Sequence, residues 1–392
     1  MSEVLYLDWP AFSSEDAKES FKKDLGFEVH TFFHEDYTLR FSGAFDSAFD
    51  LAVKDRDISF AFSYNFYPLF AEGCHRHGIK YVSLTYDNPQ VKLYSYRITY
   101  PTNYCFIFDG AEFEKLSKGG INTVYYCPLP VNSEKIDTLL AKPYNKKRTA
   151  CDISFVGSLY NEEHNIYDRM YEKLGDYERG YLDALLLAQG EIYGINFLEE
   201  SLNDRLTAAM HKAEDYAINK DGVETLSYIF ADYYLARKLT SMDRLRYLTA
   251  VAAHYPLRLF TIDKNVNIKG AGNFGTTDYY TEMPLVFHDS RINLNISLRS
   301  IKTGIPLRCM DILGAGGFLL TNYQSDMERH FTAGEDYDYF TDEADLLAKV
   351  DYYLSHDKLR ARIARNGHEK TKKYFSHKNI FSELLNIAGV RP

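Results

Sequence analysis

Between Leu294 and Thr321 the sequence passes from an apolar run to a polar turn and back to an apolar run, which restricts the folds open to the chain. The first run ends at Leu298 and is typical of a strand buried on both faces. Pro306 follows the turn and stands where a helix can begin, because its fixed φ suits a first helical position. A glycine-rich run would end that helix, and Phe318 begins a second buried strand. The segment is therefore predicted to form a strand, a basic turn, a helix and a strand.

Such a unit offers an anion-binding place at the start of its helix, where unpaired N–H groups and the helix dipole combine. Arg299 and Lys302 add two cations to the turn that leads into the helix. Asp311 lies further along the helix, where its carboxylate can accept hydrogen bonds from sugar hydroxyls. A diphosphate with a ribose attached would match this arrangement. A plain crossover between strands, with solvated cations, has the same pattern, and the sequence alone leaves both interpretations open.

Short apolar runs alternate with amphipathic helical patterns before this segment. The predicted strands of the first part are Val4–Trp9, Phe27–Phe33, Ile58–Ser63, Tyr81–Thr85, Tyr104–Phe108 and Val124–Cys127. Serine and acidic residues at Ser13–Asp16 predict a helix start after the first strand. Alternation of this kind is typical of the fold class α/β with a doubly wound parallel sheet.

The chain has 392 residues, a length that suits two or three domains. The polar stretch Lys135–Ala150 contains Pro143 and a basic run, so we interpret it as the linker between two domains. We place the first domain at residues 1–145 and the second at residues 146–392.

Composition excludes some classes of protein. The formal net charge of −10 argues against a general nucleic-acid binder or a protein of anionic membrane surfaces. An apolar content of 45% and a charged content of 26% are ordinary for a globular protein. The five scattered cysteines form no C-x-x-C pair and fit a reducing compartment. The first residues lack signal-peptide features, and no window approaches about 18 apolar residues. We therefore expect a cytoplasmic protein without a membrane span.

Polar and aromatic residues follow the strands of the predicted first domain. In a doubly wound sheet, ligands bind at the carboxyl ends of the strands. The residues at these ends include Asp8, Trp9, Asn65, Tyr86, Asp87, Asn88 and Asp109. Asp109 precedes a glycine and is equally well a plain turn residue. Asp87 and Asn88 stand in a crowded polar and aromatic loop, so we expect functional residues there.

The predicted second domain opens with a strand, Cys151–Val156, that leads directly into Gly157 and Ser158. A turn of small residues lets a ligand approach the backbone closely. From residue 162 to residue 254 the pattern is almost entirely helical, which is longer than one crossover helix needs. We interpret this range as a helical insertion, for which the sequence indicates no chemistry.

The run Gly270–Gly275 looks like a dinucleotide-binding glycine motif, but no apolar helix follows it, so we reject that interpretation. We interpret it as a flexible loop near a base or ribose, with Asn273 and Phe274 as candidate contacts. The strand before the loop is predicted at Leu257–Ile262, and a short strand after it begins at Val286–Phe287.

Three groups of residues in the second half give the chain a resemblance to a known family. They are Ser290 with Asn293-Leu294-Asn295, Pro306-Leu307-Arg308 with Asp311, and Gly317 through Thr321-Asn322. These motifs resemble the donor-binding core of GT-B glycosyltransferases, in particular the CgeB-like (spore-maturation-type) group. The run KYVSLTYDNP and the tail through Ile363–Gly367 also resemble that group. The resemblance implies two Rossmann-like domains facing a cleft, with a last helix at about 377–388 that crosses back to the first domain.

The resemblance also implies an activity, the transfer of a hexose from a nucleotide-diphosphate donor, UDP by family frequency, to a glycan, a protein or a small molecule. The candidate donor-side residues are Gly157, Ser158, Asn273, Phe274, Arg299, Lys302, Thr303, Gly304, Arg308 and Asp311. Many such enzymes carry a Glu-x7-Glu pair, and the matching positions here are Thr303 and Asp311. Asp311 can still reach a ribose, whereas Thr303 cannot supply the first carboxylate.

The acceptor side would lie in the first domain, where the candidates are Trp9, Asn65, Tyr86 and Asn88. An inverting enzyme needs a general base there, for which Asp87 is the first candidate and Asp8 the second. A retaining enzyme can work without such a base, so the stereochemistry stays open. Arg299 and Lys302 would meet the charge that develops on the leaving diphosphate.

Two Asp-x-Asp strings occur, at Asp55–Asp57 and Asp336–Asp338. Such a string binds a metal and a diphosphate in single-domain GT-A enzymes, but neither follows a buried strand in that manner, so we interpret both as surface turns. We expect no metal and no other cofactor. Two further functions stay open: a nonhydrolysing nucleotide-sugar epimerase, and a non-catalytic partner that binds a nucleotide-sugar.

Overall fold

The structure is a computed structural model that describes residues 2–161, 165–263 and 266–391. The chain forms two compact units. Unit 1 consists of Met1–Asn132, Asn219–Glu224 and Tyr374–Pro392, and unit 2 consists of Ser133–Ile218 and Thr225–Lys373. The chain therefore passes between the units at four places, and unit 1 is assembled from three segments that are far apart in the sequence.

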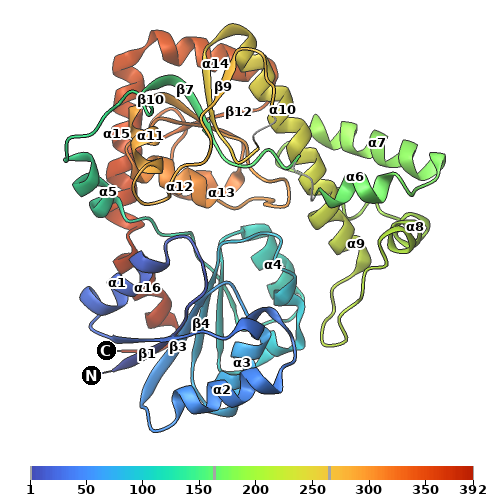
Figure 1. Ribbon diagram of the computed structural model, residues 1–392, viewed down its shortest axis with the longest axis vertical. Helices are drawn as coiled ribbons and strands as arrows, with labels where there is room; N and C mark the ends of the chain where they lie inside the picture. Colours follow the sequence, from blue (N-terminus) through green and yellow to red (C-terminus); the bar gives the residue numbers. More distant parts are fainter. Residues whose placement is uncertain (1, 162–164, 264–265, 392) are drawn as a thin grey trace. The chain divides into compact units, whose positions relative to one another are not determined.

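Unit 1 contains a sheet of six parallel strands in the order β2-β1-β3-β4-β5-β6 (Figure 1). The strands are β1 (Glu3–Leu7), β2 (Glu28–Phe32), β3 (Ile58–Tyr64), β4 (Tyr81–Thr85), β5 (Asn103–Ile107) and β6 (Val124–Tyr126). Each of them lies where the alternation of apolar runs predicted a strand. All residues of β4 are buried, as in a parallel sheet that is covered on both faces.

Helices lie between these strands, and one more comes from the last segment of unit 1. They are α1 (Ser14–Lys23), α2 (Gly43–Val53), α3 (Pro68–Arg76), α4 (Gly110–Lys118) and α16 (His377–Ile387), with 3₁₀ turns η1 (Glu35–Thr38), η2 (Val91–Tyr94) and η3 (Tyr96–Thr99). Right-handed crossovers place α1 on one face of the sheet and α2 to α4 on the other. The α16 helix packs on α1, where the rings of Phe381 and Phe21 stack with centroids 4.6 Å apart.

Unit 2 contains a second sheet of six parallel strands, in the order β12-β11-β10-β7-β8-β9. The strands are β7 (Cys151–Val156), β8 (Leu257–Phe260), β9 (Ala271–Asn273), β10 (Ser290–Asn295), β11 (Leu319–Asn322) and β12 (Asp338–Phe340). The helices of unit 2 outside the insertion between β7 and β8 are α5 (Ser133–Leu140), α11 (Met283–Asp289), α12 (Leu307–Gly314), α13 (Ser325–His330), α14 (Glu343–Ser355) and α15 (Asp357–Tyr374). Ile153 and Ile292 on the sheet share a buried core with Leu346 and Ile363 on the helices.

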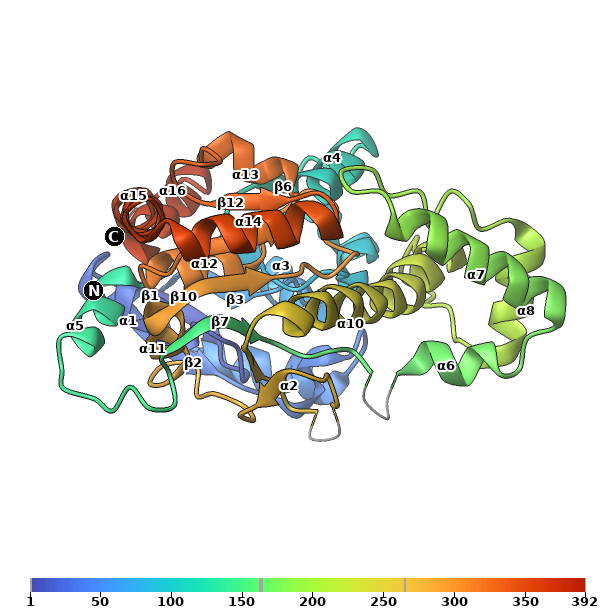
Figure 2. The ribbon, with the colours of Figure 1, turned by 90° about the horizontal axis from the view of Figure 1, so that it is seen from above.

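A helical insertion separates β7 from β8, as predicted. It contains α6 (Ile166–Tyr171), α7 (Asp176–Gly190), α8 (Asp204–Glu214), α9 (Leu226–Tyr228), the π-helical turn η4 (Ile229–Leu235) and α10 (Ala236–His254). Figure 2 shows α6, α7 and α8 gathered beyond one end of α10, away from the sheet of unit 2. Residues 162–164 of the predicted range lie outside the described residues, and Asn219–Glu224 is part of unit 1.

The predicted strand, turn, helix and strand between Leu294 and Thr321 are confirmed as β10, α12 and β11. Pro306 is the residue before the first helical residue of α12. Gly316 has a φ of +70°, which lets the chain leave the helix in a left-handed conformation that other residues adopt with strain. A Cβ atom at Gly317 would lie 2.6 Å from the carbonyl oxygen of Phe287, so α11 and this turn can pack closely.

Three local predictions were wrong. Val286–Phe287 lies in α11 rather than in a strand, because Pro284 is accepted in a first helical turn and the apolar residues there follow helical spacing. Gly270–Gly275 is not simply a loop, since its first part forms β9 and pairs with β8. The predicted linker Lys135–Ala150 begins inside α5, which extends to Leu140. Among the described residues, no helix is long and apolar enough to cross a membrane.

Candidate functional site

The strands of unit 2 end in loops that carry several of the predicted donor-side residues. Gly157 and Ser158 follow β7, and the loop from residue 296 to residue 306 follows β10. Gly157 has an extended φ of 158°, and the Ser158 hydroxyl accepts a hydrogen bond from the Tyr160 N–H at 2.9 Å. The parallel strand order places β7 beside β10, so these two loops lie next to each other at the carboxyl edge of the sheet.

Arg244, on α10, joins the two loops. Its Nε and Nη2 atoms donate to the Ile296 carbonyl at 3.0 and 2.6 Å, and Nη1 donates to the Ser158 carbonyl. The guanidinium also lies over the rings of Phe155 and Tyr160, with 5.3 and 4.8 Å to their centroids. Sequence reasoning missed Arg244, since an arginine inside a long helix carries no visible signal of a buried role.

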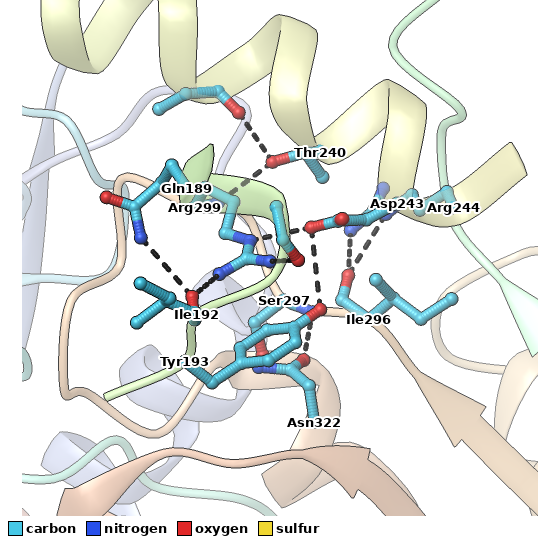
Figure 3. A network of polar contacts seen from close by, with 12 residues as sticks. Gln189, Ile192, Tyr193, Thr240, Asp243, Arg244, Ile296, Ser297, Arg299 and Asn322 are labelled. Atoms are coloured by element: carbon cyan, nitrogen blue, oxygen red, sulfur yellow. Dashed lines mark hydrogen bonds and ion pairs between the residues drawn. The ribbon is translucent and has the colours of Figure 1, made fainter. Parts of the chain in front are cut away.

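Arg299 has a different environment from the open turn that the sequence indicated (Figure 3). Its Nε donates to Asp243 at 2.6 Å, Nη1 to the Ile192 carbonyl at 2.8 Å and Nη2 to the Gly190 carbonyl at 3.3 Å. The planar group lies 3.7 Å from the centroid of the Tyr193 ring, and Arg299 is only 8% exposed. Arg299 therefore fastens the loop after β10 to the end of α7 and to α10.

The buried Asp243 depends on this ion pair. Burial raises the pKa of Asp243, and the Arg299 guanidinium opposes that rise. Thr240, one helical turn earlier on α10, accepts a hydrogen bond from the Arg299 N–H at 2.8 Å. One face of α10 thus holds the loop after β10 through Thr240, Asp243 and Arg244.

Lys302 lies on the same loop and stays partly accessible, with 19% of its side chain exposed. Its ammonium lies 3.4 Å from Asp232 and 3.8 Å from Glu199. Asp232 belongs to the π-helical turn η4, a type of turn that is frequent at functional sites. A pocket next to Lys302 is lined by Tyr193, Asn196, Ser297, Arg299 and Asn322, among other residues of unit 2.

Thr303 and Gly304 lead into α12. The Thr303 hydroxyl donates to Asp326 at 3.1 Å, and the Asp326 N–H donates to the Thr303 carbonyl at 3.0 Å. Asp326 is fully buried at the start of α13. Thr303 therefore ties the turn to α13, and its hydroxyl occupies a position where the Glu-x7-Glu pattern would have a carboxylate.

Asp311 is buried on α12, with 5% of its surface exposed. The Tyr279 hydroxyl donates to one carboxylate oxygen at 3.0 Å, and Arg308 approaches the other oxygen at 3.4 Å. Arg308 also contacts the Met283 sulfur atom and lies 5.5 Å from the Phe287 ring centroid. The structure thus brings Arg308 and Asp311 together, with Tyr279 as a third member that sequence reasoning missed.

Asn273 and Phe274 lie elsewhere on the sheet of unit 2. Asn273 ends the edge strand β9, which β7 and β8 separate from β10. Its amide donates to the Asp263 carbonyl at 2.6 Å, and Phe274 packs on Phe260 with ring centroids 5.7 Å apart. Arg258 lies over the Phe274 ring. These two residues therefore form part of the sheet edge, away from Arg308 and Asp311.

Unit 1 gathers most of the predicted acceptor-side residues at the carboxyl edge of its own sheet. Asn65 follows β3 in a left-handed conformation with a φ of 58°. Its side-chain NH₂ group donates to Asp87 at 2.7 Å, and its side-chain oxygen Oδ1 accepts hydrogen bonds from the main-chain N–H groups of Tyr86 and Asp87 at 3.1 and 3.2 Å. Asn88 in turn donates to Asp109 at 3.2 Å. Asn65 therefore sets the shape of the loop that carries Asp87.

Aromatic side chains surround this loop, and we call Trp9, Tyr37, Tyr64, Tyr67 and Tyr86 the Trp9 cluster. Trp9 stacks on Tyr86 at 6.1 Å with an interplanar angle of 6°, and on Tyr37 at 6.2 Å. Tyr67 meets the Trp9 ring edge-on at 5.9 Å. The indole N–H donates to the Tyr64 carbonyl at 3.1 Å, which fixes the ring at the end of β1. Tyr64 and Tyr67 are buried, whereas Trp9, Tyr37 and Tyr86 are partly exposed, so these three rings are the ones suited to stacking with a ring-shaped ligand.

Asp87 and Lys92 are the charged groups beside the Trp9 cluster. Asp87 itself is exposed, but the protein atoms crowded around its carboxyl group raise its pKa, against the effects of Asn65 and Lys92. Burial lowers the pKa of Lys92 to about 8, with Arg40 acting in the same direction and Asp87 against it. Sequence reasoning missed Lys92, because the short turn η2 that carries it has no visible pattern.

Asp8, the second candidate base, has a cationic partner. Its carboxylate lies 3.2 Å from the Lys18 ammonium, and Lys18 also pairs with Glu15 at 2.6 Å. Asp8 thus takes part in a small charge network at α1, whereas Asp87 is held by Asn65 and has Lys92 as its nearby charge.

The second Asp-x-Asp string is not the surface turn that we predicted. Asp336, Tyr337 and Asp338 are all buried. Asp336 accepts from the Thr332 N–H at 2.8 Å and pairs with Lys370, and Asp338 accepts from the Tyr353 hydroxyl at 2.6 Å. The string therefore anchors β12 to α14 and α15. In the part of the chain that the structure describes, no group of three or more His, Cys, Asp or Glu residues is placed to hold a metal ion.

The comparison with protein families gives one match. Residues 251–386 match a family model described as "Glycosyl transferase-like". The matched segment contains β8 to β12 and α11 to α15, and therefore Arg299, Lys302, Arg308 and Asp311. No sequence among the curated proteins matches the chain.

Solved structures share the fold along the whole chain. Sucrose-phosphate synthase from Thermosynechococcus elongatus is 10% identical and superposes with a TM-score of 0.52, over 99% of this chain and 98% of that one. HepE from Anabaena in complex with UDP-glucose is 9% identical, with a TM-score of 0.52 over 99% and 100% of the two chains. AviGT4, a glycosyltransferase of avilamycin A biosynthesis, is 9% identical, with a TM-score of 0.50 over 99% and 97%. With its two Rossmann-like units of six parallel strands each, the chain has the GT-B fold.

Proposed function

We propose that this protein is a glycosyltransferase that moves a sugar from a nucleoside diphosphate donor to a glycan, a protein or a small molecule. The observation that carries the proposal is the start of α12 with Asp311 behind it, inside the segment that matches the Glycosyl transferase-like family model. The first N–H groups of a helix attract a diphosphate, and a carboxylate one turn further accepts hydrogen bonds from a ribose. Tyr279 supports this role for Asp311, because its hydrogen bond holds one carboxylate oxygen in place.

UDP is the favoured nucleotide. The support is that HepE, which has the same fold, binds UDP and UDP-glucose, as the descriptions of its complexes state. HepE and this chain are 9% identical in sequence, so the comparison supports UDP through the shared fold and points to no single residue that would bind it. The test therefore includes other nucleotides.

Lys302 is the loop cation that we propose for contact with the diphosphate, because part of its side chain is accessible and it lines the pocket beside Ser297 and Asn322. Arg299 would act differently. Its guanidinium is engaged with Asp243 and with main-chain carbonyls, so we propose that it positions the loop that carries Lys302. Ser158 and Gly157 would line the same edge of the sheet.

Asp87 is the general base that we propose for an inverting reaction. It lies at the carboxyl end of β4, it is exposed, and Asn65 orients its carboxylate. Its raised pKa brings the carboxyl group closer to the pH at which a base works well. The acceptor would be held by the Trp9 cluster together with Asn88.

A panel of UDP-, GDP- and dTDP-sugars tests the proposal. Thermal shift measures nucleotide binding, and release of the nucleoside diphosphate is then followed with and without candidate acceptors.

Asp311→Asn should lower nucleotide affinity about 10-fold or more, since a hydrogen bond to a charged group contributes about 1.5–3 kcal/mol. Asp351→Asn, at an exposed position of α14, is the matched control and should leave affinity unchanged.

The outcomes separate the candidate functions. Release that depends on an acceptor supports a transferase, isomerisation without an acceptor would identify an epimerase, and binding without turnover would identify a non-catalytic partner. Failure of every sugar nucleotide to bind would refute the proposal.

We also propose that transfer needs no metal ion, so activity should persist in EDTA. A loss of activity that Mg²⁺ or Mn²⁺ restores would contradict that part.

A further inference from the structure

Lys92 stands out among the charged groups of unit 1. It lies in η2, directly after the loop that carries Asp87, and most of its side chain is enclosed by protein. Its ammonium lies 4.2 Å from the centroid of the Tyr67 ring, a member of the Trp9 cluster. Within residues 2–161, 165–263 and 266–391, no hydrogen bond or ion pair joins this ammonium to another residue.

An ammonium group in this position has unused bonding capacity. It carries three donors, and a ring face balances its charge only in part. A charged group enclosed by protein is stable only if it is paired, which is the reason that burial lowers the pKa of Lys92 to about 8. At neutral pH the group is still mainly protonated and can donate to an anion.

The neighbouring charged groups have partners of their own, so an anion can bind next to Lys92 without competing with them. Arg40 is the other cation in this region, and it is already paired with Asp221 at 3.2 Å and with Glu224 at 3.0 Å. Arg40 also donates to the Val91 carbonyl at 3.2 Å, which holds the start of η2. Asp87 is the nearby carboxylate, and the Asn65 amide is its hydrogen-bond donor. The phenol groups of Tyr37 and Tyr67 are uncharged at neutral pH, since burial raises the pKa of both.

We propose that this part of unit 1 takes an acidic sugar as acceptor, whose ring stacks on the Trp9 cluster and whose carboxylate or phosphate group binds to Lys92. This inference rests on the proposed transferase function and adds the class of acceptor to it. Lys92 is then the residue that selects an anionic acceptor over a neutral one, while Asp87 serves the acceptor hydroxyl.

The experiment compares three acceptors with the donor found in the nucleotide panel: a methyl hexoside, the matching methyl hexuronide and the matching hexose 6-phosphate. Lys92→Met keeps the length and apolar surface of the side chain but removes its charge, and Lys92→Arg keeps the charge. Lys118→Met, at an exposed lysine of α4, is the matched control. Nucleotide binding by thermal shift is measured for every variant.

We expect wild-type protein to prefer one or both acidic acceptors. Lys92→Met should lower kcat/KM for the acidic acceptor about 10-fold or more, with the neutral hexoside and nucleotide binding unchanged. Lys92→Arg should retain the preference, and Lys118→Met should behave as wild type. A preference for the hexuronide identifies a carboxylate and one for the hexose phosphate identifies a phosphate.

Binding of the two acidic sugars to the intact protein without donor, measured by calorimetry, gives a readout that does not depend on turnover. Loss of this binding in Lys92→Met supports the inference. If neither acidic sugar binds, or if Lys92→Met affects neutral and acidic acceptors equally, the inference is wrong, even where nucleotides bind and the transferase function holds. If sugar nucleotides fail to bind, the transferase function itself is wrong.

Discussion

At the scale of single residues, unit 2 uses its buried charges to shape the loop that follows β10. Arg244 binds the carbonyl groups of two loops, and Arg299 binds Asp243 and the end of α7. Burying a charge costs free energy unless the charge is paired and hydrogen-bonded. Each of these arginines therefore stabilises the loop only while the carbonyl and carboxylate groups around it keep their positions.

Arg299→Met should therefore destabilise the protein. Removing the guanidinium leaves Asp243 enclosed without its partner, and breaking a buried ion pair in this way costs about 3–5 kcal/mol. Arg246→Met is the control, because Arg246 forms its ion pairs with Glu191 and Glu343 at the surface, where such pairs contribute about 1 kcal/mol or less. Urea unfolding measures both variants. Equal midpoints for Arg299→Met and wild type would show that Arg299 is not needed for the loop, and direct contact with the donor would then be its better explanation.

Asp87 and Lys92 lead to a prediction about pH. Catalysis with an acidic acceptor requires Asp87 without its proton and Lys92 with its proton. Accordingly kcat/KM should rise as pH passes the pKa of Asp87, which lies above the ordinary value of 3.8, and fall as pH passes about 8. Lys92→Met should remove the fall on the alkaline side and keep the rise on the acidic side. A pH profile of both proteins checks this, and an alkaline limb that survives the substitution would assign it to another group.

Sequence reasoning located residues that follow strand ends and that the structure brings together. Asn65 follows β3 directly and Asp87 comes two residues after β4, so the parallel sheet places them side by side once the strands are identified. Lys92 and Tyr279 lie in turns and loops whose path depends on tertiary contacts. Asp243 lies on α10, 56 residues before Arg299 in the sequence, and no local pattern connects the two.

At the scale of elements, the glycines of two helices have opposite roles. Gly367 lies in α15 where the helix meets β12, and a Cβ atom there would run into the carbonyl oxygen of Asp336 and approach Leu313 to 2.8 Å. Gly180 lies in α7, and a Cβ atom there would meet open space.

Gly367→Ala should accordingly destabilise the protein by about 1–3 kcal/mol, the usual cost of forcing an extra methyl group into a packed contact. Gly180→Ala should instead stabilise it by about 0.5–1 kcal/mol, since alanine favours an exposed helix over the unfolded chain. The free energy of unfolding of the two variants gives the comparison. A stabilising effect at both positions would mean that α15 can move away from Asp336 at little cost.

The order of strands and helices could be predicted wherever the spacing of apolar residues distinguishes a strand from a helix. The six strands of unit 1 and the β10-α12-β11 unit follow directly from buried apolar runs and from Pro306. Val286–Phe287 was misassigned because a pair of apolar residues fits a strand and a short helix equally well, and only packing decides between them. The short β9 depends on its pairing with β8, which no local pattern reveals.

At the scale of the molecule, unit 1 needs a helix from the far end of the sequence. Phe381 of α16 is fully buried, stacks on Phe21 and lies 5.3 Å from the centroid of the Phe62 ring. His377 accepts or donates a hydrogen bond with Ser13 at 2.7 Å. The core of unit 1 is therefore built from both ends of the sequence.

Phe381→Ala should lower the stability of unit 1 by about 3–5 kcal/mol, as is usual when a buried phenylalanine is removed. Ile387→Ala, on the same helix but 39% exposed, should cost less than about 1 kcal/mol. Near-ultraviolet circular dichroism during thermal unfolding reports on this aromatic core. An unchanged melting curve for Phe381→Ala would show that unit 1 is stable without its C-terminal helix.

The division of unit 1 into three segments also determines when it can fold. A ribosome makes strands β1 to β6 early, but residues 219–224 and then α16 appear only after long stretches of the other unit have been made. Until α16 arrives, Phe21 and Phe62 lack the ring that covers them, so the nascent amino-terminal portion must wait in an incomplete state that exposes apolar surface. The unit whose strands are translated before those of the other unit is thus the one that reaches its native state last.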